Sequence, residues 1–148
     1  MLRAIGYWRE EWHPLKADVW RASPQVILAR LGAQAAGPQL ASYLRGGHML
    51  EVWAGWSWCR FGCGVDDSTM GDSDLTDGTW VWPEGLVHYV DAHRLPLPKE
   101  FVDHVLANNG VVPRLSAEIR ALIDEWQMSS IDRAFWNNWY LEVAGEAG

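Results

Sequence analysis

The chain of 148 residues carries a formal net charge of −7, with 49% hydrophobic and 21% charged residues. These values predict one globular domain over residues 1–148 and exclude a disordered chain or a fibrous repeat. No apolar run reaches the ~18 residues of a membrane span and the first ten residues lack the apolar core of a signal peptide, so we expect a cytoplasmic protein without a membrane partner.

The first third of the sequence predicts a short strand followed by two helices. The aromatic pair at residues 7–8 is typical of a strand. The dipeptide Ser23-Pro24 indicates a helix start, because serine caps exposed backbone N–H groups and proline suits the first turn. A second helix is predicted over residues 39–45, between the break at residues 37–38 and the glycines at 46–47.

The middle of the chain predicts two strands separated by a polar segment. Apolar residues at alternating positions predict the first strand over residues 49–58, which leads into a turn over residues 59–64. The acidic stretch 65–77 superficially resembles a calcium-binding loop, but a methionine occupies a ligand position. We therefore expect a solvated turn there. We expect a second strand over residues 78–82 and antiparallel pairing between the two strands.

The last part of the chain predicts helices. Apolar residues at helical spacing predict helices over 84–93 and 98–109. A third predicted helix begins at its cap Ser116 and ends at the serines 129–130. The tail at 135–140 is compatible with a helix or a strand. We therefore predict an α+β fold in which three to five helices pack on a small antiparallel sheet.

Four residues form a candidate metal site. Cys59 and Cys63 lie on the turn after the first predicted strand, and His88 and His93 lie on the helix after the second. Two cysteines and two histidines suit tetrahedral zinc, and four protein ligands leave no open position, so we predict a structural zinc ion. On an ideal helix the two histidines point ~140° apart, so both reach one metal only if the helix end loosens. Alternative histidine ligands are His48 and His104.

The same cysteines allow a different chemistry. Cys59 stands beside Arg60, and a thiolate stabilised by that charge and paired with His88 would be a nucleophile. The alternative hypothesis is therefore a small hydrolase or transferase in which Cys59 and His88 are catalytic. A third interpretation also remains open, in which two buried thiols and two histidines bind no metal.

Tryptophan is unusually frequent, with eleven residues in the chain. On strands, alternate residues share a face, so two pairs of tryptophans would each present one surface. Burial in the core is the favoured interpretation, and an open platform for a ligand or partner is the alternative. The candidate binding residues are these two pairs and two aspartates of the acidic stretch: Trp56, Trp58, Trp80, Trp82, Asp72 and Asp74.

Three segments resemble a family of small uncharacterised bacterial proteins. They are Ala4-Ile5-Gly6-Tyr7-Trp8, Gly55-Trp56-Ser57-Trp58-Cys59-Arg60 and the run from Leu75 to Val90, which contains Trp82-Pro83-Glu84-Gly85-Leu86. With the continuation from His93 to Val102, the resemblance covers roughly residues 4–106. It implies no activity, substrate or partner.

Charge is distributed unevenly along the chain. Residues 1–63 hold seven Arg or Lys and four Asp or Glu, and residues 64–148 hold five and fifteen. An acidic chain without a basic stripe is a poor binder of nucleic acid, whereas its acidic half could meet a basic protein. Our first functional hypothesis is a non-enzymatic bacterial protein-interaction module that zinc stabilises.

Overall fold

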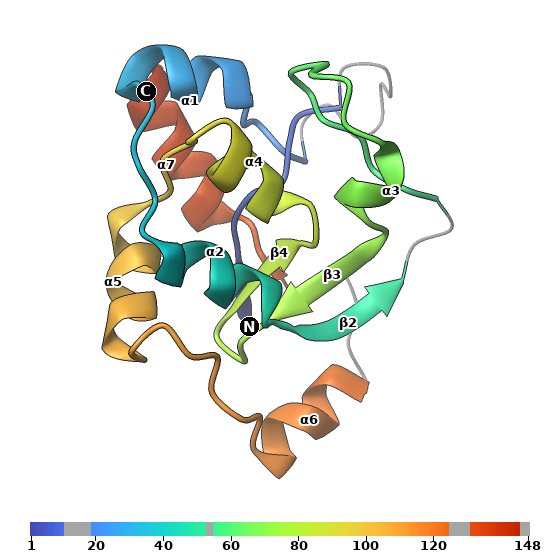
Figure 1. Ribbon diagram of the computed structural model, residues 1–148. Helices are drawn as coiled ribbons and strands as arrows, with labels where there is room; N and C mark the ends of the chain where they lie inside the picture. The colour runs from blue at the N-terminus through green and yellow to red at the C-terminus, as the bar shows by residue number, and fades with distance from the viewer. Residues whose placement is uncertain (11–18, 53–54, 125–130, 146–148) are drawn as a thin grey trace.

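The computed structural model describes residues 1–10, 19–52, 55–124 and 131–145. Within these ranges the chain forms a five-stranded sheet and seven helices (Figure 1), so the predicted α+β class is confirmed. The helices outnumber the predicted three to five, because a short helix forms in the acidic stretch and the tail is helical. Among the described residues, none of the helices has the length and apolar character needed to cross a bilayer.

The elements follow one another without a repeat. In chain order they are β1 (Leu2–Ala4), α1 (Pro24–Leu31), α2 (Pro38–Arg45), β2 (His48–Val52), α3 (Asp67–Met70), β3 (Ser73–Thr76), β4 (Trp80–Pro83), α4 (Leu86–Ala92), α5 (Lys99–Ala107), α6 (Ala117–Asp124), β5 (Ile131–Asp132) and α7 (Ala134–Ala144).

The helix signals of the sequence have direct structural counterparts. The hydroxyl of Ser23 accepts from the Val26 N–H at 3.4 Å, and Pro24 occupies the first turn of α1. Proline also opens α2, whose last turn donates from Gly46 to the Ser42 carbonyl oxygen at 3.1 Å. These ends depend on neighbouring residues alone, which is why the sequence predicts them. The predicted end of the third helix at 129–130 lies outside the described residues.

The sheet differs from the predicted one in two ways. Its strand order is β2-β3-β4-β1-β5, antiparallel through β2, β3 and β4 but parallel where β1 pairs with β4 and β5. It is therefore mixed rather than wholly antiparallel. The predicted strands over 49–58 and 78–82 do not pair directly, because β3 lies between β2 and β4. The N-terminal strand is Leu2–Ala4, not residues 7–8.

The acidic stretch is not the solvated turn that its composition predicts. The Asp66 side chain caps α3 by accepting from the Ser68 N–H at 2.9 Å. All four residues of β3 are buried, and each strand neighbour supplies a ladder of hydrogen bonds. Polar residues are tolerated there because the sheet satisfies their backbone groups.

Aromatic residues of β4 form the centre of the core. The Trp82 ring lies 6.1 Å from Tyr43 of α2 and 5.7 Å from Phe101 of α5, and Trp80 lies 5.3 Å from Phe101. Trp82 also donates its ring N–H to the Leu44 carbonyl oxygen at 3.1 Å. Burying these rings is a major source of stability, because each removes a large apolar area from water.

The tail is the long helix α7, which packs against α1 and β1. Trp136 on this helix is fully buried and donates its ring N–H to the Tyr7 carbonyl oxygen at 2.7 Å. The helix thereby holds the segment after β1, which forms one wall of the candidate binding site described below.

Candidate functional site

The four predicted metal ligands come together in the structure. One donor atom from each of Cys59, Cys63, His88 and His93 lies within 4.8 Å of the other three. The Sγ of Cys59 lies 3.4 Å from Nε2 of His93, and the Sγ of Cys63 lies 3.4 Å from Nε2 of His88. The predicted set could therefore hold one metal ion.

A tight turn positions the two cysteines. The Gly62 N–H donates to the Cys59 carbonyl oxygen at 3.0 Å, which closes a turn over Arg60 and Phe61. Gly62 has a φ of 63°, a left-handed conformation that glycine adopts without steric cost. The chain then returns Cys63 to the same side as Cys59, so three intervening residues still bring both sulfurs to one point.

The end of α4 brings together two histidines that would point in different directions on a continuous helix. His88 lies in the helix, whereas His93 is the residue that caps its C-terminus. The Tyr89 carbonyl oxygen accepts from the N–H groups of both His93 and Leu95, and Arg94 between them has a φ of 54°. The chain therefore reverses at the helix end, and the ring centroids of the histidines lie 5.0 Å apart.

Two sulfur–nitrogen distances in the cluster agree with tetrahedral coordination. Metal bonds of about 2.3 Å to sulfur and 2.0–2.1 Å to nitrogen place neighbouring S and N donors about 3.5 Å apart. The two sulfur–nitrogen distances of 3.4 Å match this value. All four donors lie within 4.8 Å of one another, so a single ion between the cysteine turn and α4 could be held by the four together.

Tyr89 supports the site from within α4, a role that the sequence analysis missed. Its hydroxyl accepts from the Arg60 N–H at 2.9 Å and donates to the Trp58 carbonyl oxygen at 3.3 Å. Burial raises the pKa of Tyr89 to about 12, which keeps this hydroxyl protonated as a donor. Its position between His88 and His93 is the sequence signal for this role.

The ionisation of two ligands bears on what the cluster can do. Burial, followed by repulsion from His93, lowers the pKa of His88, so the neutral imidazole that a metal requires is favoured. Burial raises the pKa of the Cys59 thiol, which opposes a free nucleophilic thiolate. The Sγ of Cys59 moreover lies against Nε2 of His93, whereas Nε2 of His88 lies against Cys63.

The alternative histidines have other partners. The Nε2 of His48 lies 3.0 Å from the Pro113 carbonyl oxygen. The Nε2 of His104 lies 3.0 Å from a carboxylate oxygen of Asp77, whose side chain is fully buried. Neither histidine belongs to the four-residue cluster.

Asp77 organises a polar network that the sequence analysis did not foresee. One carboxylate oxygen accepts from the Tyr43 hydroxyl at 2.6 Å, and the other accepts from the N–H groups of Thr79 and Trp80 at 2.9 and 2.7 Å. The Asp-Gly dipeptide predicts only the backbone turn; the contacts to Tyr43 and His104 depend on α2 and α5.

The candidate binding tryptophans separate into two classes. Trp80 and Trp82 are 3% and 0% exposed, so these two are core residues and cannot form an open platform. Trp56 and Trp58 follow β2 rather than extending it, and are 60% and 39% exposed. The predicted strand over 49–58 ends at residue 52, and residues 53–54 lie outside the described part.

A cleft lies beside the exposed pair and has a volume of about 320 Å³. Its walls come from the segment after β1, the segment 55–60 that precedes and begins the cysteine turn, and the region from α3 to β4. Asp72 and Asp74 lie in its lining, Asp72 half-buried and Asp74 almost fully buried. We call this hollow the aromatic–acidic cleft; its walls include Tyr7, Trp56, Trp58, Asp72, Asp74 and Glu84.

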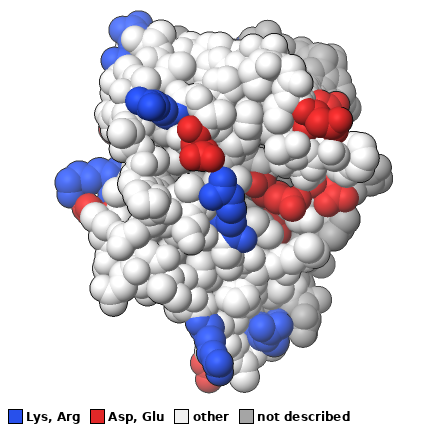
Figure 2. Space-filling model, in the orientation of Figure 1, with Lys and Arg blue, Asp and Glu red and all other residues white. Residues whose placement is uncertain are grey.

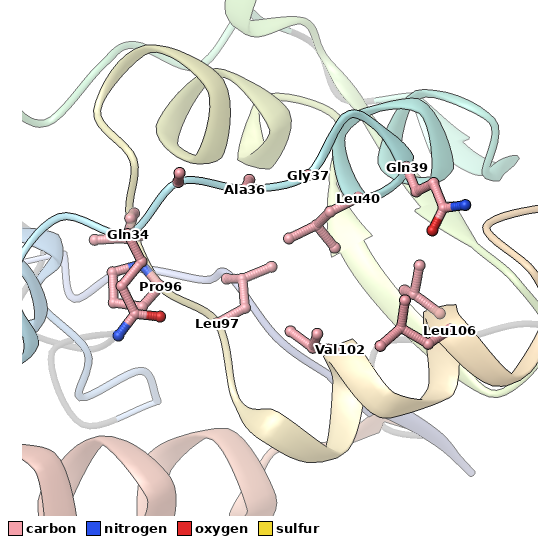
Figure 3. Close-up of a pocket in the computed structure, with 12 residues that line it drawn as sticks. Gln34, Ala36, Gly37, Gln39, Leu40, Pro96, Leu97, Val102 and Leu106 are labelled. Atoms are coloured by element: carbon pink, nitrogen blue, oxygen red, sulfur yellow. The ribbon is translucent and has the colours of Figure 1, made fainter.

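A second, smaller hollow of about 170 Å³ lies between α2, α5 and the segment before each (Figure 3). Leu40, Leu97, Val102 and Leu106 point toward one another across it. Among the described residues, its lining contains glutamine but no charged side chain. It thus lacks groups that would orient a polar ligand.

Charged side chains of both signs lie on the face shown in Figure 2. Several acidic groups gather toward the side of β2, β3 and α3, and basic groups lie over the helices and near α6 with further acidic groups beside some of them. Neither family models, nor curated proteins, nor solved structures gave a match to this chain, so its function rests on its own residues and geometry.

Proposed function

We propose that the protein is a non-enzymatic protein-interaction domain that one structural zinc ion stabilises. Cys59, Cys63, His88 and His93 are the ligands in this proposal. The observation that carries it is the convergence of their four donor atoms within 4.8 Å.

The chemistry of the donors supports zinc. Thiolate sulfur and imidazole nitrogen in a tetrahedral arrangement are typical of zinc, whereas calcium and magnesium require oxygen ligands. Four protein donors also fill the coordination sphere, so no position remains for a reacting water or substrate. A structural role follows from that closed set, and a reducing cytoplasm would keep both cysteines available as thiols.

The position of the centre supports a role in maintaining the binding surface. Zinc would join the cysteine turn to α4, and Trp58 directly precedes Cys59. The Ser57 N–H donates to the Gly71 carbonyl oxygen at 3.0 Å on the other side of this segment. A metal bound at Cys59 and the hydrogen bond at Ser57 would together fix the segment that carries Trp56 and Trp58.

Composition and surface support a protein as the partner. The chain is acidic overall, and four of its acidic residues line a cleft that also contains exposed indole rings. Aromatic residues are enriched in protein interfaces because they bury a large area at low entropic cost. The resemblance to small bacterial proteins leads us to propose a bacterial origin.

Metal content and melting temperature test this function. We expect native mass spectrometry of the untagged protein to detect one zinc ion per chain. At free zinc about 1,000-fold above Kd the ion stabilises the fold by about 4 kcal/mol, so chelation should lower Tm by about 8–16 °C. A folded chain that takes up no zinc on titration, and whose Tm is indifferent to the chelator, would refute the metal part.

Cys63→Ser is the best variant because Cys63 is exposed and Cys59 is buried. Serine at the buried position would destabilise the core even without a metal. We expect Cys63→Ser to lose the ion and lower Tm in zinc, but to match the wild type when both are in chelator. His48→Gln is the matched control, since it removes a histidine outside the cluster and retains a donor for Pro113.

A further inference from the structure

The aromatic–acidic cleft has a chemistry of its own, separate from the metal centre. Among the described residues, four carboxylates contribute to its lining, from Glu10, Asp72, Asp74 and Glu84, together with the guanidinium of Arg60. These described residues carry a formal charge of −3, from four acidic groups and one basic group. This balance repels phosphates and other anions and favours a cationic ligand.

The carboxylates are held in place by the fold. Asp74 is 2% exposed and accepts from the Tyr7 hydroxyl at 2.8 Å. Glu84 accepts from the Asp72 N–H at 3.0 Å, and the Asp72 side chain accepts from the Ser73 hydroxyl at 3.1 Å. Each contact fixes one oxygen from the protein side, so the acidic groups are preorganised before a ligand arrives.

Indole rings form another part of the lining. Trp56 is 60% exposed, although burial of so large a ring is strongly favourable. The guanidinium carbon of Arg60 already lies 3.6 Å from the centroid of the Trp58 ring. The chain's own arginine thus uses one indole as a cation–π partner, and the cleft offers Trp56 as a second indole.

We propose that the aromatic–acidic cleft binds an arginine side chain presented by a basic segment of a partner protein. The planar guanidinium would stack on Trp56 and donate in pairs to the carboxylates of Asp72 and its neighbours. A volume of about 320 Å³ lies at the lower end of the range for ligand sites, which suits one long side chain. This inference rests on the proposed function, because it names the partner class of that interaction domain.

Peptide binding to the zinc-loaded full chain tests the proposal. The probe is an acetylated and amidated peptide of alternating arginine and glycine, and titration calorimetry measures Kd. Two peptides of the same length replace every arginine by lysine or by uncharged citrulline. We expect the arginine peptide to bind most tightly and the citrulline peptide at least about 10-fold more weakly, because it lacks the cationic charge.

Two variants assign the binding to the cleft. Trp56→Ala removes an exposed ring and Asp72→Asn keeps the shape of the side chain, so both should fold. We expect each to weaken the arginine peptide by about 3- to 10-fold, the size of one exposed cation–π contact or charge-assisted hydrogen bond. The matched controls are Leu106→Ala and Asp91→Asn, which alter an exposed apolar residue and a surface acid elsewhere and should leave Kd unchanged.

The outcomes separate this proposal from the proposed function. No binding of the arginine peptide to zinc-loaded, folded protein overturns the cleft assignment while the metal centre stands. Equal Kd values for the arginine, lysine and citrulline peptides, or unchanged Kd in both cleft variants, also overturn it. Tight arginine binding by a chain that takes up no zinc supports the cleft and refutes the metal centre instead.

Discussion

Asp77 gives the sharpest test of how this fold is stabilised. Its carboxylate accepts from the Tyr43 hydroxyl and from the N–H groups of Thr79 and Trp80, and contacts His104 at 3.0 Å. Asp77→Ala removes all four interactions. Two of the groups left without a partner, the Tyr43 hydroxyl and the Trp80 N–H, belong to buried residues.

The size of the loss follows from those two groups. A buried polar group that loses its partner costs about 1–3 kcal/mol, so two cost about 2–6 kcal/mol, and we expect a loss of about 4 kcal/mol. Thr79 is exposed and His104 is half-exposed, so water replaces the carboxylate at both residues. The loss of these two contacts therefore adds little to the free-energy cost. For a chain of this length the loss lowers Tm by about 8–16 °C.

Urea unfolding of zinc-loaded protein measures the effect, with the free energy extrapolated to zero urea. Asp77→Asn should lose only about 1–2 kcal/mol, because its amide oxygen still accepts from the backbone of the turn. Asp91→Ala is the control, since Asp91 forms a surface ion pair with Arg45 and should change stability by less than about 0.5 kcal/mol. A loss below about 1 kcal/mol for Asp77→Ala would refute the reasoning.

Three further substitutions probe other parts of the structure. Burial, and then the hydrogen bond to Asp77, raises the pKa of Tyr43 above its ordinary value of 10, so this residue contributes stability that is present below pH 10 and lost above it. In Tyr43→Phe, the free energy of unfolding measured in urea should therefore fall above pH 10 by about 1.4 kcal/mol less per pH unit than in the wild type. Trp82→Ala should cost about 3–5 kcal/mol by the same assay, and a cost below about 1 kcal/mol would contradict its place in the core. Gly71→Ala should lower Tm in a thermal melt, because Gly71 has a φ of 74° and a Cβ there would overlap the Glu84 carboxylate; an unchanged Tm would show that this close approach is not needed.

The four-residue cluster that could hold a metal is the part of the site that the sequence predicts best. Each half depends on short-range structure: a glycine-containing turn returns Cys63 to Cys59, and one helix with its cap carries His88 and His93. Spacing within one turn or one helix is encoded locally, so the ligand set can be inferred from residue types and separations. That the two halves meet requires the fold, and Tyr89 is the residue that joins them.

The aromatic–acidic cleft could not be predicted in the same way. Its walls come from the start of the chain, the segment after β2 and the region from α3 to β4. Tryptophans at 56, 58, 80 and 82 share the same spacing in sequence, yet one pair is exposed and the other is buried. Burial depends on which elements cover a strand, and α2 and α5 cover β4 but not the segment 55–58.

The sequence by itself determines the α+β class, the ends of the helices at Ser23 and Gly46, and the four metal-ligand candidates, because capping, turn and ligand chemistry act between near neighbours. Only the tertiary structure decides the parallel pairing of β1 with β4 and β5, the burial of β3 and the formation of the cleft. These features join residues far apart in the chain, and their free energy comes from shared burial and from sheet hydrogen bonds that no local pattern specifies.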